Sequence, residues 1–200
     1  MKLLVSAASP YVRKVRVLIR ELELTDKITE QTVATTALNS DASVVAANPM
    51  GKIPALIRDD APTLYDSRVI TRFLNDTNEG SFYPAARIWE TLTLEATGDG
   101  IMDTTVSMAY EVRLRPEAEQ SPDWVEAQWQ KASRGIKAVN DRWMSHLSGP
   151  LDMSQIAIAC ALSYVDLRHD MRNWRDGNEA LAAWFAEFEK RDSMQATKPA

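Results

Sequence analysis

The chain of 200 residues contains one cysteine, Cys160, and two histidines, His146 and His169. A single cysteine excludes an internal disulfide, a CxxC redox pair and a zinc site built from several cysteines. The two histidines lie far apart in the sequence, and neither has an obvious ligand cluster around it. We therefore expect no metal site.

Long apolar runs are also absent. The longest unbroken run, from Ile156 to Leu162, is far too short to cross a bilayer. The first residues contain one lysine and only a short apolar stretch before Ser6, whereas a secretory signal needs a longer apolar region and a small-residue cleavage site. These absences predict a cytoplasmic protein with no membrane association and a reduced thiol.

An excess of basic residues is missing as well. The formal net charge is -5, which argues against a nucleic-acid-binding protein with a broad basic surface. The apolar fraction of 45% is sufficient for a packed core, so disulfide bonds are not needed for stability.

The composition changes near residue 80. All the tryptophans follow this point, and residues 78–84 are rich in turn-forming residue types. Before it, strand and helix patterns alternate; after it, nearly every segment has a helical pattern. We therefore predict an N-terminal domain of residues 1–77, a linker of residues 78–86 and an all-helical C-terminal domain of residues 87–200.

The first part has a β-α-β-β-α order. Ser9 and Pro10 form a typical helix start, with serine as N-cap and proline in the first turn. The helix that follows is amphipathic, and Arg13 and Lys14 are expected mainly off its apolar face. Strands on either side of it imply a parallel pair with a right-handed crossover. The expected strands are residues 2–5, 28–35, 53–57 and 63–65, and the expected helices are residues 10–24 and a segment from Asp66 or Ser67 onward.

The second part is predicted to contain four helices. Asp152 and Gln155 match a capping box with aspartate at the N-cap, and the helix after them is apolar for about two turns. This helix is expected to lie in the core with Cys160 buried as a small apolar residue. Most of the tryptophans are also expected in the core. The predicted helices are residues 87–112, 122–147, 152–168 and 179–190.

Ordered motifs along nearly the whole chain carry a family resemblance. They are Ser9-Pro10-Tyr11-Val12-Arg13-Lys14-Val15, Asn48-Pro49-Met50-Gly51-Lys52-Ile53-Pro54-Ala55-Leu56 and Leu64-Tyr65-Asp66-Ser67, with weaker matches at residues 99–103 and 156–162. This set resembles the glutathione S-transferase superfamily, and specifically its small bacterial, serine-type members. The resemblance implies a thioredoxin-like α/β domain followed by a helical bundle, and a cytoplasmic homodimer that uses glutathione as co-substrate without a metal. The Asp152–Gln155 segment departs from the Ser/Thr-x-x-Asp box usual in this superfamily.

Ser9 occupies the position at which the family places its thiol-activating residue. The residues alone explain Ser9 as a helix N-cap. The resemblance adds a second role, in which its hydroxyl donates a hydrogen bond to the glutathione sulfur and the helix N-terminus favours the thiolate. Ser6 and Tyr11 are competitors for this role, although Tyr11 looks more like a wall of the electrophile pocket.

The other two N-terminal motifs resemble the family's glutathione-binding segments. The resemblance implies a cis bond between Ile53 and Pro54, which aims the Ile53 amide and carbonyl at the cysteinyl residue of glutathione. Lys52 is either a partner for a glutathione carboxylate or a solvated lysine. Asp66 suits the γ-glutamyl ammonium, and Ser67 with the helix amides suits the γ-glutamyl carboxylate. Ordinary helix capping also accounts for these last two residues.

Asp103 is a weaker candidate. Some family members bind the γ-glutamyl ammonium with an acidic residue of the partner subunit, and Asp99 and Asp103 lie four apart on one helical face. A solvated helix aspartate is the simpler account of each. The resemblance predicts a detoxifying transferase that activates glutathione for attack on a small hydrophobic electrophile. Two alternatives stay open: a binding or regulatory protein with little turnover, and a glutathione-dependent peroxidase.

Overall fold

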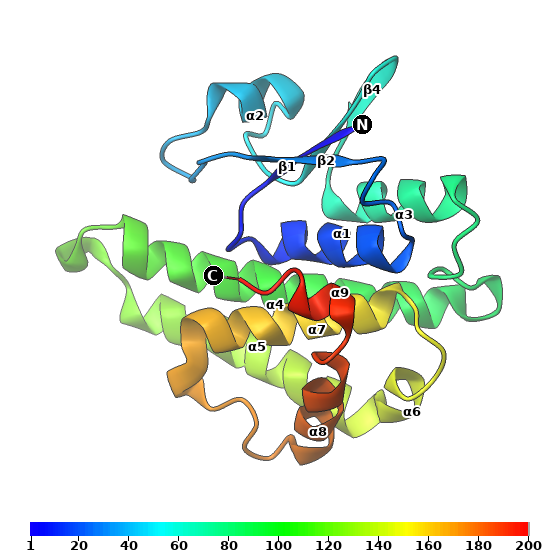
Figure 1. The fold of residues 1–200 in the computed structure, drawn as a ribbon. Coiled ribbons are helices and arrows are strands. Elements are labelled where there is room, and N and C mark those ends of the chain that lie inside the picture. The colour runs from blue at the N-terminus through cyan, green and yellow to red at the C-terminus, as the bar shows by residue number, and fades with distance from the viewer. Residues whose placement is uncertain (200) are drawn as a thin grey trace. The chain divides into compact units, whose positions relative to one another are not determined.

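In a computed structural model, which describes residues 1–199, the chain divides into two compact units (Figure 1). Unit 1 comprises Met1–Ala85 and a segment that begins at Asp192, and unit 2 comprises Ala86–Arg191. The sequence analysis assigned residues 87–200 to the second domain. The return of the chain to unit 1 at Asp192 differs from that assignment.

Unit 1 contains a four-stranded sheet with strand order β2-β1-β3-β4. The first two strands pair in parallel, and β3 is antiparallel to both of its neighbours. The predicted parallel pair is therefore confirmed, and β3 and β4 form an antiparallel hairpin. The third strand begins two residues later than predicted, because Pro54 has no N–H to donate to a ladder. The strands are β1 (Lys2–Val5), β2 (Thr29–Thr32), β3 (Ala55–Arg58) and β4 (Ala61–Leu64).

Helices cover both faces of this sheet. Figure 1 shows α1 and α3 on one side and α2 on the other. The apolar face predicted for the first helix is buried, since Val12, Val15 and Leu18 are fully inaccessible. The helices of unit 1 are α1 (Pro10–Glu21), α2 (Ala42–Ala47), α3 (Ser67–Thr77) and the short α9 (Asp192–Gln195).

The burial of Arg13 and Lys14 in α1 corrects the sequence prediction. Both were expected away from the apolar face, yet they are only 5% and 0% exposed. Arg13 donates from Nη2 to the Met194 carbonyl at 3.0 Å and from Nε to Thr197 Oγ1 at 3.4 Å. The C-terminal segment thus covers a polar part of α1 through hydrogen bonds, which hydrophobic periodicity does not detect.

The segment predicted as a linker is packed onto α3 through most of its length. The Phe82 amide donates to Asn75 Oδ1 at 2.9 Å, and the Gly80 amide donates to the Asn75 carbonyl at 2.8 Å. Tyr83 Oη and Thr71 Oγ1 are 2.8 Å apart. Residues 80–83 are therefore an ordered extension of unit 1.

Unit 2 is helical throughout, as predicted. The single helix expected for residues 122–147 is interrupted at Trp143, so that a long and a short helix follow each other. Among residues 1–199, no helix combines the length and the apolar character needed to cross a membrane. The helices of unit 2 are α4 (Ile88–Leu114), α5 (Pro122–Arg142), α6 (Met144–Leu147), α7 (Met153–His169) and α8 (Glu179–Phe188). One-turn 3-10 helices are present at Ala85–Arg87, Glu117–Glu119 and Asp170–Arg172.

The core of unit 2 is built around α7, which packs closely against α4. Every residue from 153 to 162 is buried, and Cys160 is fully inaccessible, as predicted. A Cβ atom at Gly98 of α4 would meet the Ala157 backbone at 3.0 Å, so glycine permits the close approach of the two helices.

The tryptophans are not mainly core residues, and that prediction was wrong. Within residues 1–199 only Trp174 is buried, at 4% exposure, whereas Trp89 is 75% exposed. Trp184 illustrates the intermediate case: its indole N–H donates to the Leu147 carbonyl at 3.0 Å while part of the ring stays accessible. Large amphipathic rings of this kind commonly remain partly at the surface.

The predicted capping box begins α7. Asp152 Oδ1 accepts from the Ser154 amide at 3.0 Å, and Gln155 Oε1 accepts from the Asp152 amide at 3.2 Å. Aspartate and glutamine therefore form both reciprocal hydrogen bonds of a capping box.

The second carboxylate oxygen of Asp152 joins α7 to other segments of unit 2. Asp152 Oδ2 lies 2.9 Å from His146 Nε2 and accepts from Thr91 Oγ1 at 3.1 Å. Arg87 Nη2 is 3.5 Å from the same oxygen. Because Asp152 is fully buried, these partners replace the water that its charge would otherwise require.

Candidate functional site

The strand register of unit 1 brings three predicted segments to one edge of the sheet. Leu4 of β1 pairs with Ala55 of β3, so the residues that follow β1 and those that precede β3 lie at the same edge. Leu64 of β4 pairs with Leu56 of β3 in the antiparallel sense, which places the residues after β4 at that edge too. Ser9, the Ile53–Pro54 bond and the Asp66–Ser67 pair therefore belong to one region of unit 1.

Ser9 caps α1 and keeps a hydrogen to donate. Its extended backbone precedes the helix, and its Oγ accepts a hydrogen bond from the Val12 amide at 3.3 Å. That bond uses a lone pair of the hydroxyl and leaves the O–H group available to another acceptor. Capping and a bond to a ligand are therefore compatible at this side chain.

The N-terminus of α1 is electrostatically suited to an anion. The first turn contains no acidic residue, so nothing in it neutralises the positive end of the helix dipole. Ser6 lies before the turn, where its carbonyl accepts from the Ser9 amide at 3.2 Å. Tyr11 is half-buried in the first turn of the helix.

The loop before β3 is held in shape by Asn48, which the sequence analysis did not single out. This buried side chain donates to the Lys52 carbonyl at 2.9 Å and accepts from the Met50 amide at 3.0 Å. Gly51 has φ +63°, and a Cβ there would lie 2.7 Å from Ser40 Oγ. The Asn48-Pro49 dipeptide followed by Gly51 is a sequence pattern that indicates a turn at this position.

The Ile53–Pro54 peptide bond is cis, as the resemblance implied. The Ile53 side chain packs against the buried cluster that includes Leu4 and Val44, which fixes its position. Its backbone makes no backbone hydrogen bond within residues 1–199. The amide and carbonyl of Ile53 can therefore pair with an extended ligand. Lys52 is exposed and forms no ion pair within the same described range.

Asp66 caps α3 and is held as an anion. Its Oδ1 accepts from the Arg68 amide at 3.1 Å, and its Oδ2 lies 3.0 Å from Arg68 Nη2. Burial by itself would raise the pKa of Asp66, but the Arg68 side chain, the Arg68 amide and the charge of Lys14 outweigh it and lower this pKa. The Tyr65–Asp66 peptide bond is also cis.

Ser67 is the first residue of α3 and is only 3% exposed. Its hydroxyl makes no hydrogen bond to any residue in the described part of the chain. The first-turn amides of a helix lack intrahelical acceptors. Ser67 and these amides together can accommodate a carboxylate.

Asp99 and Asp103, both on α4 of unit 2, differ in solvent exposure. Asp103 is exposed, whereas Asp99 is buried at 6%. Asp103 is therefore accessible at the surface of unit 2, whereas burial makes Asp99 unsuitable for contact with another molecule. Residues 1–199 contain no group of three or more His, Cys, Asp or Glu side chains that could hold a metal ion.

Comparisons with known proteins follow the same division of the chain. Residues 8–77 match the model of the glutathione S-transferase N-terminal domain, and residues 122–187 match that of the C-terminal domain. A structure of a glutathione transferase family member from Pseudomonas fluorescens Pf-5 with bound glutathione is 38% identical, with a TM-score of 0.97, over 100% of this chain and 98% of that one. The chain belongs to the glutathione S-transferase family. The thioredoxin-like N-terminal fold and the helical C-terminal fold expected from the sequence are those of this family.

Other relatives of this glutathione S-transferase family member also match along their whole length. A glutathione S-transferase from Methylobacillus flagellatus KT with glutathione bound is 33% identical, with a TM-score of 0.86, and covers 100% of this chain and 99% of that one. A second Pseudomonas fluorescens Pf-5 structure, with S-(propanoic acid)-glutathione, is 37% identical over 100% of both chains, with a TM-score of 0.92. The uncharacterized GST-like protein YibF of Escherichia coli K12 is 29% identical over 100% of this chain and 98% of its own.

Proposed function

We propose that this protein is a glutathione transferase of the serine type, in which the Ser9 hydroxyl donates a hydrogen bond to the glutathione sulfur. One observation carries the proposal: the full-length relatives at 38% and 33% identity have glutathione in their structures. The free O–H of Ser9 at the unneutralised N-terminus of α1 supports it. Both features favour thiolate over thiol and lower the pKa of the bound thiol.

Glutathione would be held along the same edge of unit 1. In this proposal the Ile53 amide and carbonyl pair with the cysteinyl residue like an added strand. Ser67 and the first-turn amides of α3 take the γ-glutamyl carboxylate, and Asp66 takes the ammonium. Lys52, which is exposed and has no ion pair within residues 1–199, neutralises a further glutathione carboxylate.

The reaction would be attack of the thiolate on an electrophilic carbon of a small hydrophobic substrate. A carbon–sulfur bond forms as the bond to the leaving group breaks, and the leaving group departs with the electron pair. The protein contributes positioning and thiolate stabilisation rather than a covalent intermediate. Tyr11 is half-buried and lies two residues after Ser9 in the sequence. In this proposal its side chain lines the electrophile pocket.

Two measurements test this function. Calorimetric titration should detect glutathione binding, and the absence of both heat and thermal stabilisation at millimolar glutathione would contradict it. Turnover should then be seen with chlorodinitrobenzene as electrophile. Binding without turnover across a panel of electrophiles would favour a binding or regulatory protein instead, and turnover restricted to organic hydroperoxides would favour a peroxidase.

We further propose a cytoplasmic homodimer that acts in detoxification, with Asp103 contacting glutathione bound to the partner subunit. In unit 1, Tyr65 and Val69 are large apolar residues that are 38% and 46% exposed, as expected of a face covered by another chain. Light scattering of the purified protein should give twice the chain mass. Val69→Asp should yield monomers, whereas Asp103→Asn should weaken glutathione binding without dissociating the dimer.

Asn48 is expected to act as a positioning residue for glutathione. Replacing Asn48 by alanine removes both hydrogen bonds that shape the loop before Ile53. We expect the Kd for glutathione to rise up to about thirtyfold, with a much smaller change in kcat, because each of the two lost bonds is worth about 1 kcal/mol. Calorimetry and initial-rate kinetics measure the two effects. Asn39→Ala, at an exposed position outside this loop, is the matched control and should leave both constants unchanged.

Glutathione binding should depend on the charge of Asp66. Because the pKa of Asp66 is lowered in the folded protein, its carboxylate stays ionised through neutral and mildly acidic pH. Affinity should therefore be flat as pH falls, until it weakens below about pH 4, the ordinary range of an aspartate. Calorimetric titrations at a series of pH values measure this decrease in affinity, and circular dichroism confirms that the protein stays folded. The Asp66→Asn variant should bind glutathione more weakly at neutral pH and should show no further loss of affinity at low pH. If the variant still lost affinity below the same pH, the titrating group would be a different residue.

A further inference from the structure

The glycyl end of glutathione is the part of the ligand to which the proposed function assigns the fewest contacts. In that proposal the Asp66–Ser67 pair, which follows β4, takes the γ-glutamyl end, and Ile53 takes the cysteinyl residue. The strand order places β4 on one side of β3 and both β1 and β2 on the other. In this pose the glycyl end is directed away from β4, toward residues 33–52 of the connection between β2 and β3.

Positive charge is scarce along this connection. Residues 28–51 contain no lysine, arginine or histidine, so Lys52 is its one basic residue. The Lys52 side chain is exposed and forms no ion pair within residues 1–199. An ion pair between exposed groups adds little to affinity, because water and salt screen both charges. Lys52 alone therefore cannot make the glycyl carboxylate a strong determinant of binding.

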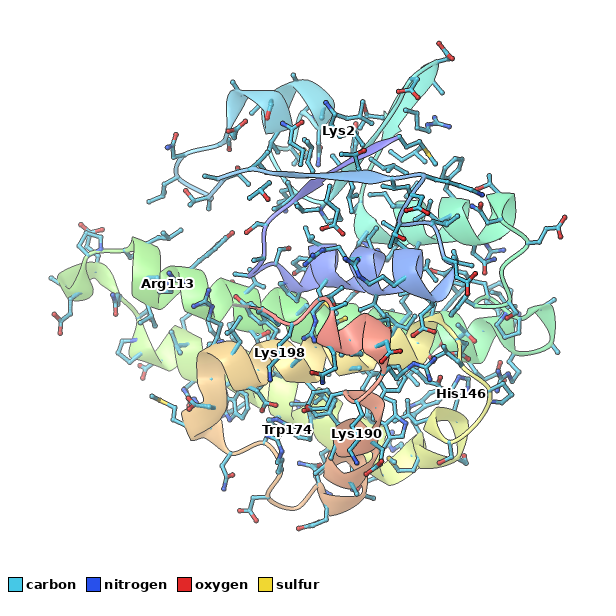
Figure 2. The ribbon with its side chains drawn as sticks, viewed as in Figure 1. Lys2, Arg113, His146, Trp174, Lys190 and Lys198 are labelled. Atoms are coloured by element: carbon cyan, nitrogen blue, oxygen red, sulfur yellow. The ribbon has the colours of Figure 1, made fainter. Side chains whose placement is uncertain are left out.

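Three other basic residues of unit 1 do not supplement Lys52. Lys2, labelled in Figure 2, is the first residue of β1 and pairs with β3 at the edge of the sheet opposite to the cis bond. Arg16 and Arg20 lie 2.8 and 3.1 Å from the carboxylate of Glu30, which neutralises part of their charge. Each of the three is therefore either at the wrong edge of the sheet or already paired.

The connection also carries a negative charge close to the turn that precedes Ile53. The Thr35 hydroxyl accepts from the Asp41 amide at 3.3 Å and donates to the Gly51 carbonyl at 3.5 Å, so it ties Asp41 to this turn. Hydrogen bonds from the Ser43 hydroxyl and amide lower the pKa of Asp41, and its carboxylate stays charged at neutral pH. A carboxylate on this side of the site repels the free glycyl carboxylate of a ligand.

Two apolar side chains lie near Lys52 on the same turn and on α2. Val45 and Met50 are 45% and 69% exposed. A Cβ atom at Gly51 would lie 3.8 Å from Val45 Cγ2, so Val45 stands beside the turn that carries Met50 and Lys52. We name Val45, Met50 and Lys52 the glycyl-side surface. Its exposed apolar groups suit an uncharged, partly apolar ligand group better than a carboxylate.

We propose that the glycyl-side surface admits glutathione derivatives whose glycyl carboxylate is blocked as an ester or an amide, so that these compounds also serve as co-substrates. The inference rests on the proposed transferase function and names a substrate class for it. Blocking the carboxylate removes an exposed interaction with Lys52 and relieves the repulsion from Asp41. The alkyl or aryl part of the ester or amide gains contact with Val45 and Met50. The thiol, the γ-glutamyl end and the bonds that form and break stay the same.

Calorimetry with glutathione and its glycyl ethyl ester tests the inference on the full-length protein. The two Kd values should agree within about fivefold, because only an exposed ion pair is lost. The diethyl ester, which also blocks the γ-glutamyl carboxylate, should bind at least about tenfold more weakly than the glycyl ester. The reason is that Ser67, assigned to that carboxylate, is only 3% exposed. The glycyl ester should also be conjugated to chlorodinitrobenzene.

Two variants separate the charge from the apolar contact. Lys52→Gln should weaken glutathione binding by no more than about fivefold and leave binding of the glycyl ester unchanged. Met50→Ser should weaken binding of the glycyl benzylamide of glutathione at least about threefold without changing the Kd of glutathione itself. Met171→Ser, at an exposed methionine of unit 2, is the matched control and should leave every Kd unchanged.

The outcomes distinguish this inference from the function on which it rests. If glutathione binds and the Kd of the glycyl ester is higher by more than the expected margin, the inference is wrong and the transferase function stands. Equal losses for both ligands in Lys52→Gln, or equal losses of benzylamide binding in Met50→Ser and Met171→Ser, would overturn it in the same way. If neither glutathione nor the ester binds, the proposed function fails and the inference fails with it. Thermal unfolding of each variant separates lost binding from lost folding.

Discussion

Replacing Ser9 by alanine is expected to lower kcat/KM for glutathione conjugation about a hundredfold, a typical loss when a group acting on the reacting atom is removed. The Ser9 hydroxyl accepts from the Val12 amide and retains its own hydrogen for the sulfur. Without it, the bound thiol should titrate at higher pH. Glutathione affinity should change by no more than about threefold, because the contacts assigned to Ile53, Asp66 and Ser67 remain.

The design of this experiment separates Ser9 from its neighbours. Ser6→Ala is the matched control and should keep full turnover, and Ser9→Thr should recover part of the lost rate, because it retains a hydroxyl. Ultraviolet absorbance of the bound thiolate as a function of pH measures the thiol pKa directly. Unchanged turnover in Ser9→Ala, or a loss equal to it in Ser6→Ala or Tyr11→Phe, would move the thiol-activating role to another residue.

Replacing Asp152 by alanine is expected to reduce the free energy of unfolding of unit 2 by about 3 kcal/mol, the scale of losing one partner of a buried charged network. The substitution removes the N-cap of α7 and leaves the groups around Oδ2 without their common acceptor. Because residues 153–162 form the buried centre of unit 2, loss of this helix start should affect the whole unit.

Urea unfolding monitored by tryptophan fluorescence measures this effect, since all the tryptophans of the chain lie in unit 2. Asp141→Ala, at an exposed aspartate of α5 paired with Lys137, is the matched control and should leave the midpoint unchanged. Asp152→Asn should fall between the two, because an amide can still cap the helix. Equal midpoints for Asp152→Ala and the wild type would assign the stability of α7 to its apolar packing alone.

Local patterns predicted most of the fold. Ser9-Pro10 marked the start of α1, the Asp152–Gln155 pair marked the start of α7, and the apolar run after it marked the buried helix. The buried position of Arg13 was missed, because it depends on partners that are distant in the sequence. Arg13 is buried because Met194 and Thr197 supply its acceptors, and no periodicity within residues 10–24 contains that information.

The candidate site was predictable to the same extent. The resemblance implied the cis bond at Pro54, and helix-start chemistry indicated Asp66 and Ser67. Arg68 was not expected to hold Asp66, and Asn48 was not expected to organise the loop, because both contacts depend on backbone geometry that the sequence does not display. Residue identity thus indicated which groups are available, and the folded backbone determined what each of them contacts.

The contact between the segment that begins at Asp192 and α1 affects the order in which the two units can fold during synthesis. Unit 1 is discontinuous in sequence. Arg13 can therefore form its hydrogen bonds to Met194 and Thr197 only after all of residues 86–191 have been synthesised. Unit 2, by contrast, is continuous and can complete its core first. The helix that carries Ser9 is therefore among the last elements to acquire its full set of contacts, although it is among the first to be synthesised.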